Sequence, residues 1–303
     1  MKSGTTWRVP SRPRHNRWDP TVPPVVEVPS NAVLALQTIS ADDGQIDRED
    51  PSPDFDRDRI HPLTGPIAIE GAQPGDALRV EVLSIVPATW GWQLVTDDRG
   101  FLRHTGMRDE VIVCALDVTS QVARYPSGTL VPMRPMLGIV GVAPDTKVPL
   151  RTIEPGVFGG NLDIAELTVG STIWLPVQVP GALLSIGDVH AAQGDGEVCL
   201  TGIETGADVV VRVTLESDLL LDRPRFETPG GLGVTGFGRE TDIALRDSLE
   251  AAIDLLVTHG LSREEAYAIC SACGDLRLSQ VVNGEVRGSH LLLPHETIRS
   301  LPG

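Results

Sequence analysis

The hydrophobic residues of this chain gather in short runs of strand length. Between residues 31 and 220 these runs alternate with segments that contain Gly, Pro and Asp, and little helical periodicity separates them. Val, Leu, Ile and Ala dominate the runs, which is typical of buried strands. The runs are residues 31–38, 60–70, 77–85, 111–118, 138–142, 171–179 and 208–215. The pattern predicts a mainly β body over residues 31–220, either a β-sandwich or a barrel-like sheet.

A turn signal divides two of these runs. Pro74 and Gly75 separate the run 60–70 from the alternating run 77–85. Strand, Pro-Gly turn and strand are the sequence signature of a hairpin, so we expect these two runs to pair.

The two ends of the chain differ from this body. Residues 1–30 are rich in Pro and Arg and predict an N-terminal arm, whereas residues 222–238 are rich in Pro, Gly and Arg and predict a linker or an active-site loop. Helical spacing follows, and Ser262 with Glu265 forms a capping-box pattern. The elements expected there are helices at 241–259 and 262–272, a strand at 276–282, an Asn283-Gly284 turn and a strand at 285–293. Residues 221–303 therefore predict a smaller α+β part packed on the body.

Composition excludes several classes of partner. The chain has 303 residues, with 25 basic and 41 acidic side chains, and its net charge of -16 repels phosphate backbones and anionic lipid surfaces. No apolar stretch reaches the roughly 18 residues of a membrane span, and the N-terminus lacks the pattern of a signal peptide. Four scattered cysteines fit a reducing compartment. We therefore expect a cytoplasmic protein that binds neither nucleic acid nor membranes.

Candidate chemistry concentrates in residues 187–197, between two apolar runs, 181–186 and 198–203, that both predict buried strands. Asp188 and His190 are two apart, so in an extended segment they face the same way and form a natural pair of metal ligands. Asp195 and Glu197 share a face in the same manner, and one of them could take a proton from water. The alternative is an acidic turn with a hydrogen-bonded histidine.

A second cluster lies in residues 158–164. The backbone NH of Gly160 can approach a ligand closely, and Asn161 and Asp163 follow it on one face. An Asx-turn without further function is the alternative. His61, which Pro62 biases toward extended geometry, is a third candidate.

Several segments together resemble the acetamidase/formamidase family. They are 61–66 (HPLTGP), 70–76 (EGAQPGD), 138–144 (GIVGVAP), 159–163 (GGNLD), 187–197 (GDVHAAQGDGE), 265–271 (EAYAICS) and 275–280 (DLRLSQ). The matching segments span roughly residues 60–295 and follow one another in the same order as in the family. It implies a mainly β fold with a smaller mixed part, and metal-assisted hydrolysis of short amides to a carboxylate and ammonia.

The resemblance also carries the two acidic segments over as the walls of the active site. A divalent metal, zinc by expectation, would be held by Asp163, Asp188 and His190. Glu197, or Asp195 in its place, would be the base.

Substrate contacts are expected from three further residues, and the expected partners are few. Gly160 NH, Asn161 and His61 would contact the substrate. The partners would be a small amide and other copies of the chain, in a homo-oligomer of two or more subunits. Two alternatives stay open: a cyclic-amide (γ-lactam) hydrolase, and a non-catalytic β protein with a structural metal ion.

Overall fold

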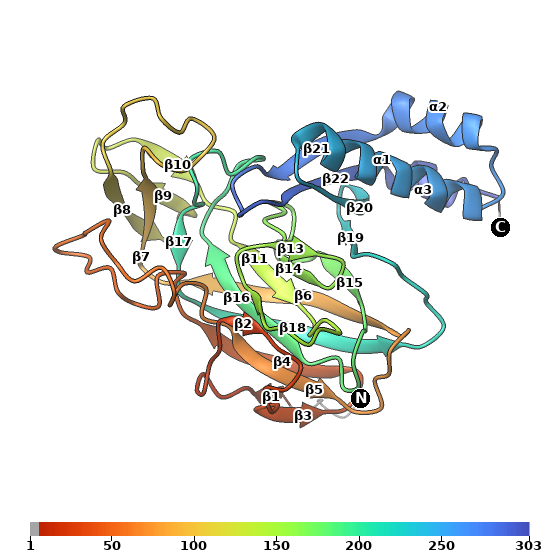
Figure 1. Ribbon diagram of the computed structural model, residues 1–303, viewed down its shortest axis with the longest axis horizontal. Coiled ribbons are helices and arrows are strands. Elements are labelled where there is room, and N and C mark those ends of the chain that lie inside the picture. The colour runs from red at the N-terminus through yellow and green to blue at the C-terminus, as the bar shows by residue number, and fades with distance from the viewer. Residues whose placement is uncertain (1–5, 303) are drawn as a thin grey trace.

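Two large sheets and three helices make up the fold. The structure, a computed structural model, describes residues 6–302. Figure 1 shows the sheets side by side, with the helices gathered at the C-terminal end of the chain. Neither sheet closes into a barrel, since both have free edge strands. The prediction of a mainly β fold is confirmed.

The first sheet has nine strands. In spatial order they are β1 (Thr6–Arg8), β4 (Ala32–Thr38), β18 (Ala207–Glu216), β6 (Ala77–Pro87), β15 (Thr172–Pro176), β19 (Arg225–Thr228), β20 (Gly231–Gly238), β22 (Arg287–Leu293) and β21 (Asp275–Gln280). Its longest ladder, between β18 and β6, is antiparallel and covers all ten residues of β18. Alternate residues of β18, such as Val209, Val211 and Val213, are buried, as the period of two requires.

The second sheet has eleven strands and carries most of the polar clusters identified above. Its path is β10 (Leu130–Pro132), β9 (Val122–Arg124), β8 (Glu110–Asp117), β7 (Trp90–Val95), β17 (Glu204–Thr205), β16 (Leu184–His190), β11 (Met136–Gly141), β14 (Gly159–Asn161) and β13 (Pro155–Gly156), with β5 (Thr64–Ile69) and β3 (Val26–Val28) joined at its side. A separate ladder pairs β2 (Arg17–Trp18) with β12 (Leu150–Arg151).

Strand β16 is buried along its whole length. It lies between β11 on one side and β5 and β17 on the other, and the largest hydrophobic core joins its residues to those of β4, β6 and β18 in the other sheet. Polar side chains on β16 are therefore held in a water-excluded environment.

Three helices cover one end of the nine-stranded sheet: α1 (Thr241–Thr258), α2 (Arg263–Cys273) and α3 (His295–Arg299). Ala252 and Leu256 of α1 pack with Leu291 of β22 in a second core. The approach is close because Gly236 has no side chain: a Cβ there would overlap the backbone of Ser248. Among residues 6–302, none of the helices is long and apolar enough to cross a membrane.

Several local predictions are confirmed. Both helices form where expected, and the Ser262 hydroxyl accepts a hydrogen bond from Glu265 N at 3.1 Å. Strands β21 and β22 pair antiparallel on either side of the Asn283-Gly284 turn. The expected division into arm, body and C-terminal part stays a prediction, although the nine-stranded sheet takes strands from all three.

Three local predictions are wrong. Strands β5 and β6 belong to different sheets, so they form no hairpin: β5 pairs with β16 and β3, and β6 pairs with β18 and β15. Residues 222–238 contain the paired strands β19 and β20 instead of a linker, since the Phe226 ring packs over Gly233 and anchors the pair in the sheet. Residues 198–203 form turns, and strand structure resumes only at Glu204.

The capping bond of Ser262 leads to a prediction on stability. Ser262→Ala leaves the Glu265 amide without its partner and should lower the free energy of unfolding by about 1 kcal/mol. Urea denaturation followed by circular dichroism measures it. Ser262→Asp keeps an acceptor and should retain most of the stability; equal losses in both variants would contradict the capping role.

Candidate metal centre and active site

A cluster of buried ionisable side chains forms around His190, the last residue of β16. Asp188 lies two residues before it on the same strand, and Glu204 comes from the adjacent strand β17. Asp163 follows β14, and Glu197 lies in the loop between β16 and β17. All five side chains are buried. The structure thus brings together Asp163, Asp188, His190 and Glu197, which the sequence singled out, and adds Glu204.

The backbone at this cluster is strained. Asp163, Asp188 and Glu197 have φ angles of 47°, 53° and 47°, in the left-handed region, and His61 beside them has a φ of 54°. L-residues with side chains adopt this region at a cost, and such residues gather at functional sites. The backbone of β16 therefore departs locally from regular strand geometry at Asp188, and the simple alternation expected from the sequence does not hold there.

Space for two of the acids comes from a glycine on the neighbouring strand. A Cβ on Gly138 of β11 would lie 2.8 Å from Asp163 Oδ1 and 2.5 Å from the backbone oxygen of Asp188. Any larger residue at this position would push the acids apart.

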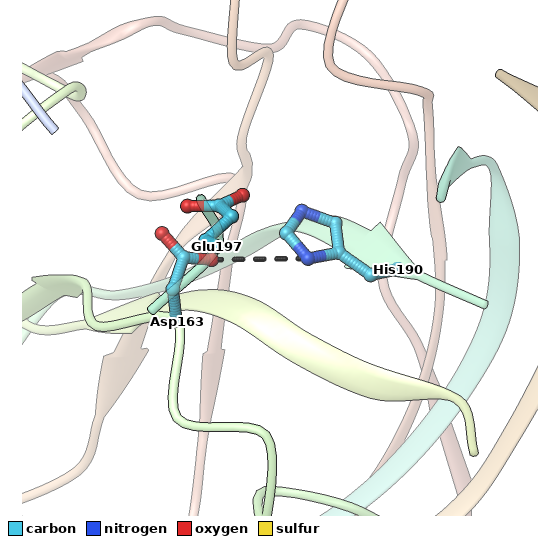
Figure 2. A group of neighbouring side chains, drawn as sticks. All are labelled: Asp163, His190 and Glu197. Atoms are coloured by element: carbon cyan, nitrogen blue, oxygen red, sulfur yellow. Dashed lines mark ion pairs between the residues drawn. The ribbon is translucent and has the colours of Figure 1, made fainter. Parts of the chain in front are cut away.

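The two ring nitrogens of His190 lie near different acids. Nε2 lies 3.5 Å from Asp188 Oδ1 and 3.1 Å from Glu204 Oε1. Nδ1 lies 3.8 Å from Asp163 Oδ1, the pair that the dashed line joins in Figure 2. Figure 2 also shows the carboxyl groups of Asp163 and Glu197 side by side, facing the ring. Two groups of three could therefore hold a metal ion: Asp188, His190 and Glu204, or Asp163, His190 and Glu197.

Gln193 distinguishes these two groups. Its Nε2 donates to the backbone oxygens of Asp163 at 2.8 Å and Ser279 at 3.4 Å, which turns its Oε1 toward His190 Nδ1 at 2.7 Å. An amide oxygen only accepts, so Nδ1 carries the proton and the lone pair of the neutral ring is on Nε2. The geometry therefore favours Asp188, His190 and Glu204 as the metal-binding group.

The donor set of this group fits a divalent ion. Asp188 Oδ1, His190 Nε2 and Glu204 Oε2 are buried and have no hydrogen-bond partner among residues 6–302. Zinc ligands at about 2.1 Å in tetrahedral geometry are roughly 3.4 Å apart, close to the separations observed here. One nitrogen and two carboxylate oxygens are the ligand types of catalytic zinc sites.

Burial and mutual charge shift the pKa values of the cluster. Burial raises the pKa of Glu204 to about 8 and that of Asp163 to about 7, against the attraction of His190. Burial, followed by the charge of Asp163, raises the pKa of Glu197 well above its usual range. Burial alone would raise the pKa of Asp188, but His61 and His190 outweigh it and lower the pKa. In the absence of a cation, Asp163, Glu197 and Glu204 therefore bind protons more tightly than exposed carboxyl groups do.

The cluster forms part of the wall of a cavity of about 490 Å³. Asp188, Glu197, Glu204, His61 and Asn161 all line it. Buried atoms without partners in the described chain include Asn161 Oδ1 and His61 Nδ1, and burial lowers the pKa of His61. Both residues line the cavity, and their role as substrate contacts stays a prediction.

Two expected site residues lie elsewhere. Asp195 is exposed and outside the cavity lining, and the charged groups that act on it are Glu166, Arg277 and Arg134. Gly160 is paired with Val140 and Pro155 on either side and does not line the cavity. The structure therefore brings neither residue to the cavity.

The sequence alone missed three residues of the site. Glu204 lies one residue beyond a run that was interpreted as a strand, Gln193 carries no charge, and Asn283 was assigned to a turn only. In the structure Asn283 Nδ2 donates a hydrogen bond to Asp163 Oδ2. A carboxylate directly after a buried apolar run was the one signal that could have indicated Glu204.

The C-terminal hairpin holds the loop that carries Glu197. Gly196 N donates to Ser279 O at 3.0 Å, and Val281 N donates to Gly196 O at 3.1 Å. Glu197 Oε1 accepts from Gly202 N at 3.1 Å, which fixes the carboxylate from the other side. Residues from the C-terminal quarter of the chain are thus structural parts of this site.

The fold and the site define a mainly β protein with a buried carboxylate–imidazole centre suited to a divalent metal. A model described as the Acetamidase/Formamidase family matches residues 5–150 and 146–298. The chain belongs to this family, as the resemblance of its motifs predicted.

Known relatives agree with this assignment. An acetamidase of Mycolicibacterium smegmatis is 31% identical in an alignment 269 residues long, and the alignment covers 67% of this chain and 66% of the relative. The crystal structure of an acetamidase from Bacillus halodurans superposes with a TM-score of 0.92 at 28% identity, covering 98% of this chain and 99% of that one. A γ-lactamase from Delftia acidovorans has a TM-score of 0.67 at 26% identity, covering 93% of this chain and 88% of that one.

The raised pKa values predict how metal binding depends on pH. A metal ion displaces the protons held by Glu204, with a pKa of about 8, and by His190, whose pKa is also raised through Glu204 and Asp188 against the effect of burial. Affinity for Zn²⁺ should therefore rise between about pH 6 and pH 8.5, with release of protons. Calorimetric titration in buffers of different ionisation enthalpy measures both quantities. An affinity independent of pH would contradict the assignment.

Proposed function

We propose that this protein hydrolyses short linear amides to a carboxylate and ammonia with the help of a divalent metal ion. The expectation of an amidase is confirmed by membership of the acetamidase/formamidase family. The observation that supports metal assistance is the buried, partner-free donor set of Asp188, His190 and Glu204 beside the cavity. Zinc is the proposed ion, because one imidazole and two carboxylates suit its preferences.

Each residue of the site then has a task set by its position. Asp188, Glu204 and His190 Nε2 would hold the ion, with Gln193 keeping the imidazole proton on Nδ1. Asp163 takes no part in this group, which changes the ligand set expected from the sequence. When bound, the ion would polarise the amide carbonyl and lower the pKa of a water molecule.

The pair of Asp163 and Glu197 would move the protons. Amide hydrolysis needs a base that takes a proton from water and an acid that gives one to the departing nitrogen. Glu197 faces the cavity, and its Oε2 is buried without a partner in the described chain. We assign the role of base to Glu197, which would then return the proton to the departing amine. Asp163 would share this proton with Glu197 and orient it.

Asn161 would bind the substrate amide. Its Nδ2 donates to Ile153 O at 3.0 Å, which leaves Oδ1 as a free acceptor at the cavity wall. An acceptor at this point can receive a hydrogen bond from the NH₂ group of the substrate and hold the carbonyl toward the metal-binding group. His61 Nδ1 is a second free acceptor nearby.

Two further expectations stay proposals. We propose a cytoplasmic protein, supported by four cysteines that are all free thiols in the structure. We also propose a homo-oligomer of two or more subunits, which light scattering after size-exclusion chromatography tests.

Two isosteric variants separate metal binding from proton transfer. Glu197→Gln should keep bound zinc and lose at least about a hundredfold in kcat, the contribution of a positioned base. Glu204→Gln removes a proposed ligand and should lower zinc content together with activity. Metal analysis by mass spectrometry and ammonia release from acetamide give the two readouts. Zinc lost from Glu197→Gln but retained by Glu204→Gln would assign the metal to the other group.

Chelation and a panel of amides test the reaction itself. Removal of metal should abolish ammonia release from acetamide, and added Zn²⁺ should restore it. The panel contains formamide, acetamide, propionamide and a γ-lactam, and we expect the linear amides to be the better substrates. Full activity after chelation would contradict metal assistance, and exclusive turnover of the lactam would favour the γ-lactamase-like alternative.

A further inference from the structure

The cavity that contains the site is bordered by an unusual concentration of arginine. Five of the chain's 25 basic residues line it, although the protein as a whole carries a net charge of -16. They are Arg57, Arg99, Arg103, Arg151 and Arg287. Arg57 lies in the loop before β5, and Arg99 and Arg103 lie in the loop between β7 and β8. Arg151 ends β12, and Arg287 begins β22. We refer to these five residues as the arginine rim.

Three of the five arginines form no ion pair in the described part of the chain, although Asp54, Asp98 and Asp109 attract Arg57. Arg99 and Arg151 lie 3.9 Å from Asp98 and 3.6 Å from Asp58. Arg57, Arg103 and Arg287 form no ion pair within residues 6–302.

Arg57 is the best fixed of the three unpaired arginines. Its guanidinium stacks 4.7 Å from the centroid of the Phe55 ring and is half-buried. Burial, followed by the charge of Arg99, lowers the pKa of Arg57 against the attraction of Asp98, Asp109 and Asp54, and both arginines line the cavity. A fixed cation with unused donors is a site for an anion.

The cavity is also too large for the smallest amides. A water molecule occupies about 30 Å³ of liquid, so acetamide, with four heavy atoms, takes roughly 100 Å³. The cavity holds about 490 Å³, and Trp92, Leu94 and Leu200 give it apolar lining in addition to the acids and the arginines. The remaining space suits a longer substrate with an apolar middle section.

We propose that the preferred substrates are amides whose acyl chain ends in a carboxylate, with the amide at the acidic cluster, the apolar spacer along Trp92 and Leu200, and the carboxylate at the arginine rim. This inference rests on the proposed amide hydrolysis and names its substrate class. Guanidinium groups bind carboxylates through paired, charge-assisted hydrogen bonds, which the amide end of the site does not provide.

A matched series of amides tests the inference. The series comprises monoamides of dicarboxylic acids with two to six methylene groups, neutral amides of equal chain length, and amides ending in an ammonium group. The best monoamide should exceed its neutral counterpart in kcat/KM by about tenfold or more, mainly through KM, and the ammonium amides should be poorest. This preference should weaken at high salt, because the rim is exposed to solvent.

Arginine variants locate the carboxylate. Arg57→Gln and Arg287→Gln should each reduce the advantage of the monoamide, by about tenfold for Arg57, the better fixed of the two. Arg299→Gln, on the surface of α3 and paired with Glu296, is the matched control and should leave the advantage intact. Thermal unfolding verifies that each variant is folded.

The outcomes separate the two proposals. Equal or faster hydrolysis of the neutral amides would overturn the inference while leaving the amidase function in place. No hydrolysis of any amide would overturn the amidase function, and the rim would then be tested by calorimetric binding of the best monoamide and its neutral counterpart to Glu197→Gln. Equal affinities there would also overturn the inference.

Discussion

The cost of burying charge is the constraint on which this structure depends. Four carboxyl groups and an imidazole lie in a region from which the two sheets exclude water, and each of the five would be better solvated outside. Hydrogen bonds offset part of the cost: Gln193 and Asn283 bind His190 and Asp163, and Gly202 N binds Glu197. The buried atoms that remain without a partner face one another, which is the arrangement a cation stabilises. The fold thus positions a set of charges that a bound metal ion would complete.

This constraint explains why the backbone at the site is strained and why glycines pack against it. The strained backbone at Asp163, Asp188 and Glu197 persists because the surrounding strands and the C-terminal hairpin hold it. Gly138 and Gly202 are the two close approaches: a Cβ on Gly202 would lie 2.5 Å from His190 Nδ1. The apolar cores on either side, which consist mainly of Val, Leu and Ile, offset the stability lost at these positions.

The cavity combines two opposite electrostatic environments. Part of its lining is acidic and suited to a cation, and five arginines line it as well. An amide substrate is neutral at the reacting group, so neither environment alone selects it. Together they define an orientation, because a substrate with an anionic end fits in one direction and is repelled in the other. Specificity in this site would then come from residues far from the chemistry.

Sequence by itself determined the mainly β class and both long helices, because period and capping are local properties, whereas the pair of Asp188 and His190 as metal ligands stays a prediction. It also identified the family from the order of its motifs. Only the tertiary structure decided that β5 and β6 pair in different sheets, that Asp195 lies outside the cavity, and that Glu204 and Gln193 belong to the site. These outcomes depend on which strands become neighbours, and strand order depends on competition among many apolar partners. The direction of the His190 lone pair depends on the hydrogen bond that its Nδ1 donates to Gln193 Oε1, and the Gln193 amide is itself oriented by residues 30 and 86 positions away along the chain.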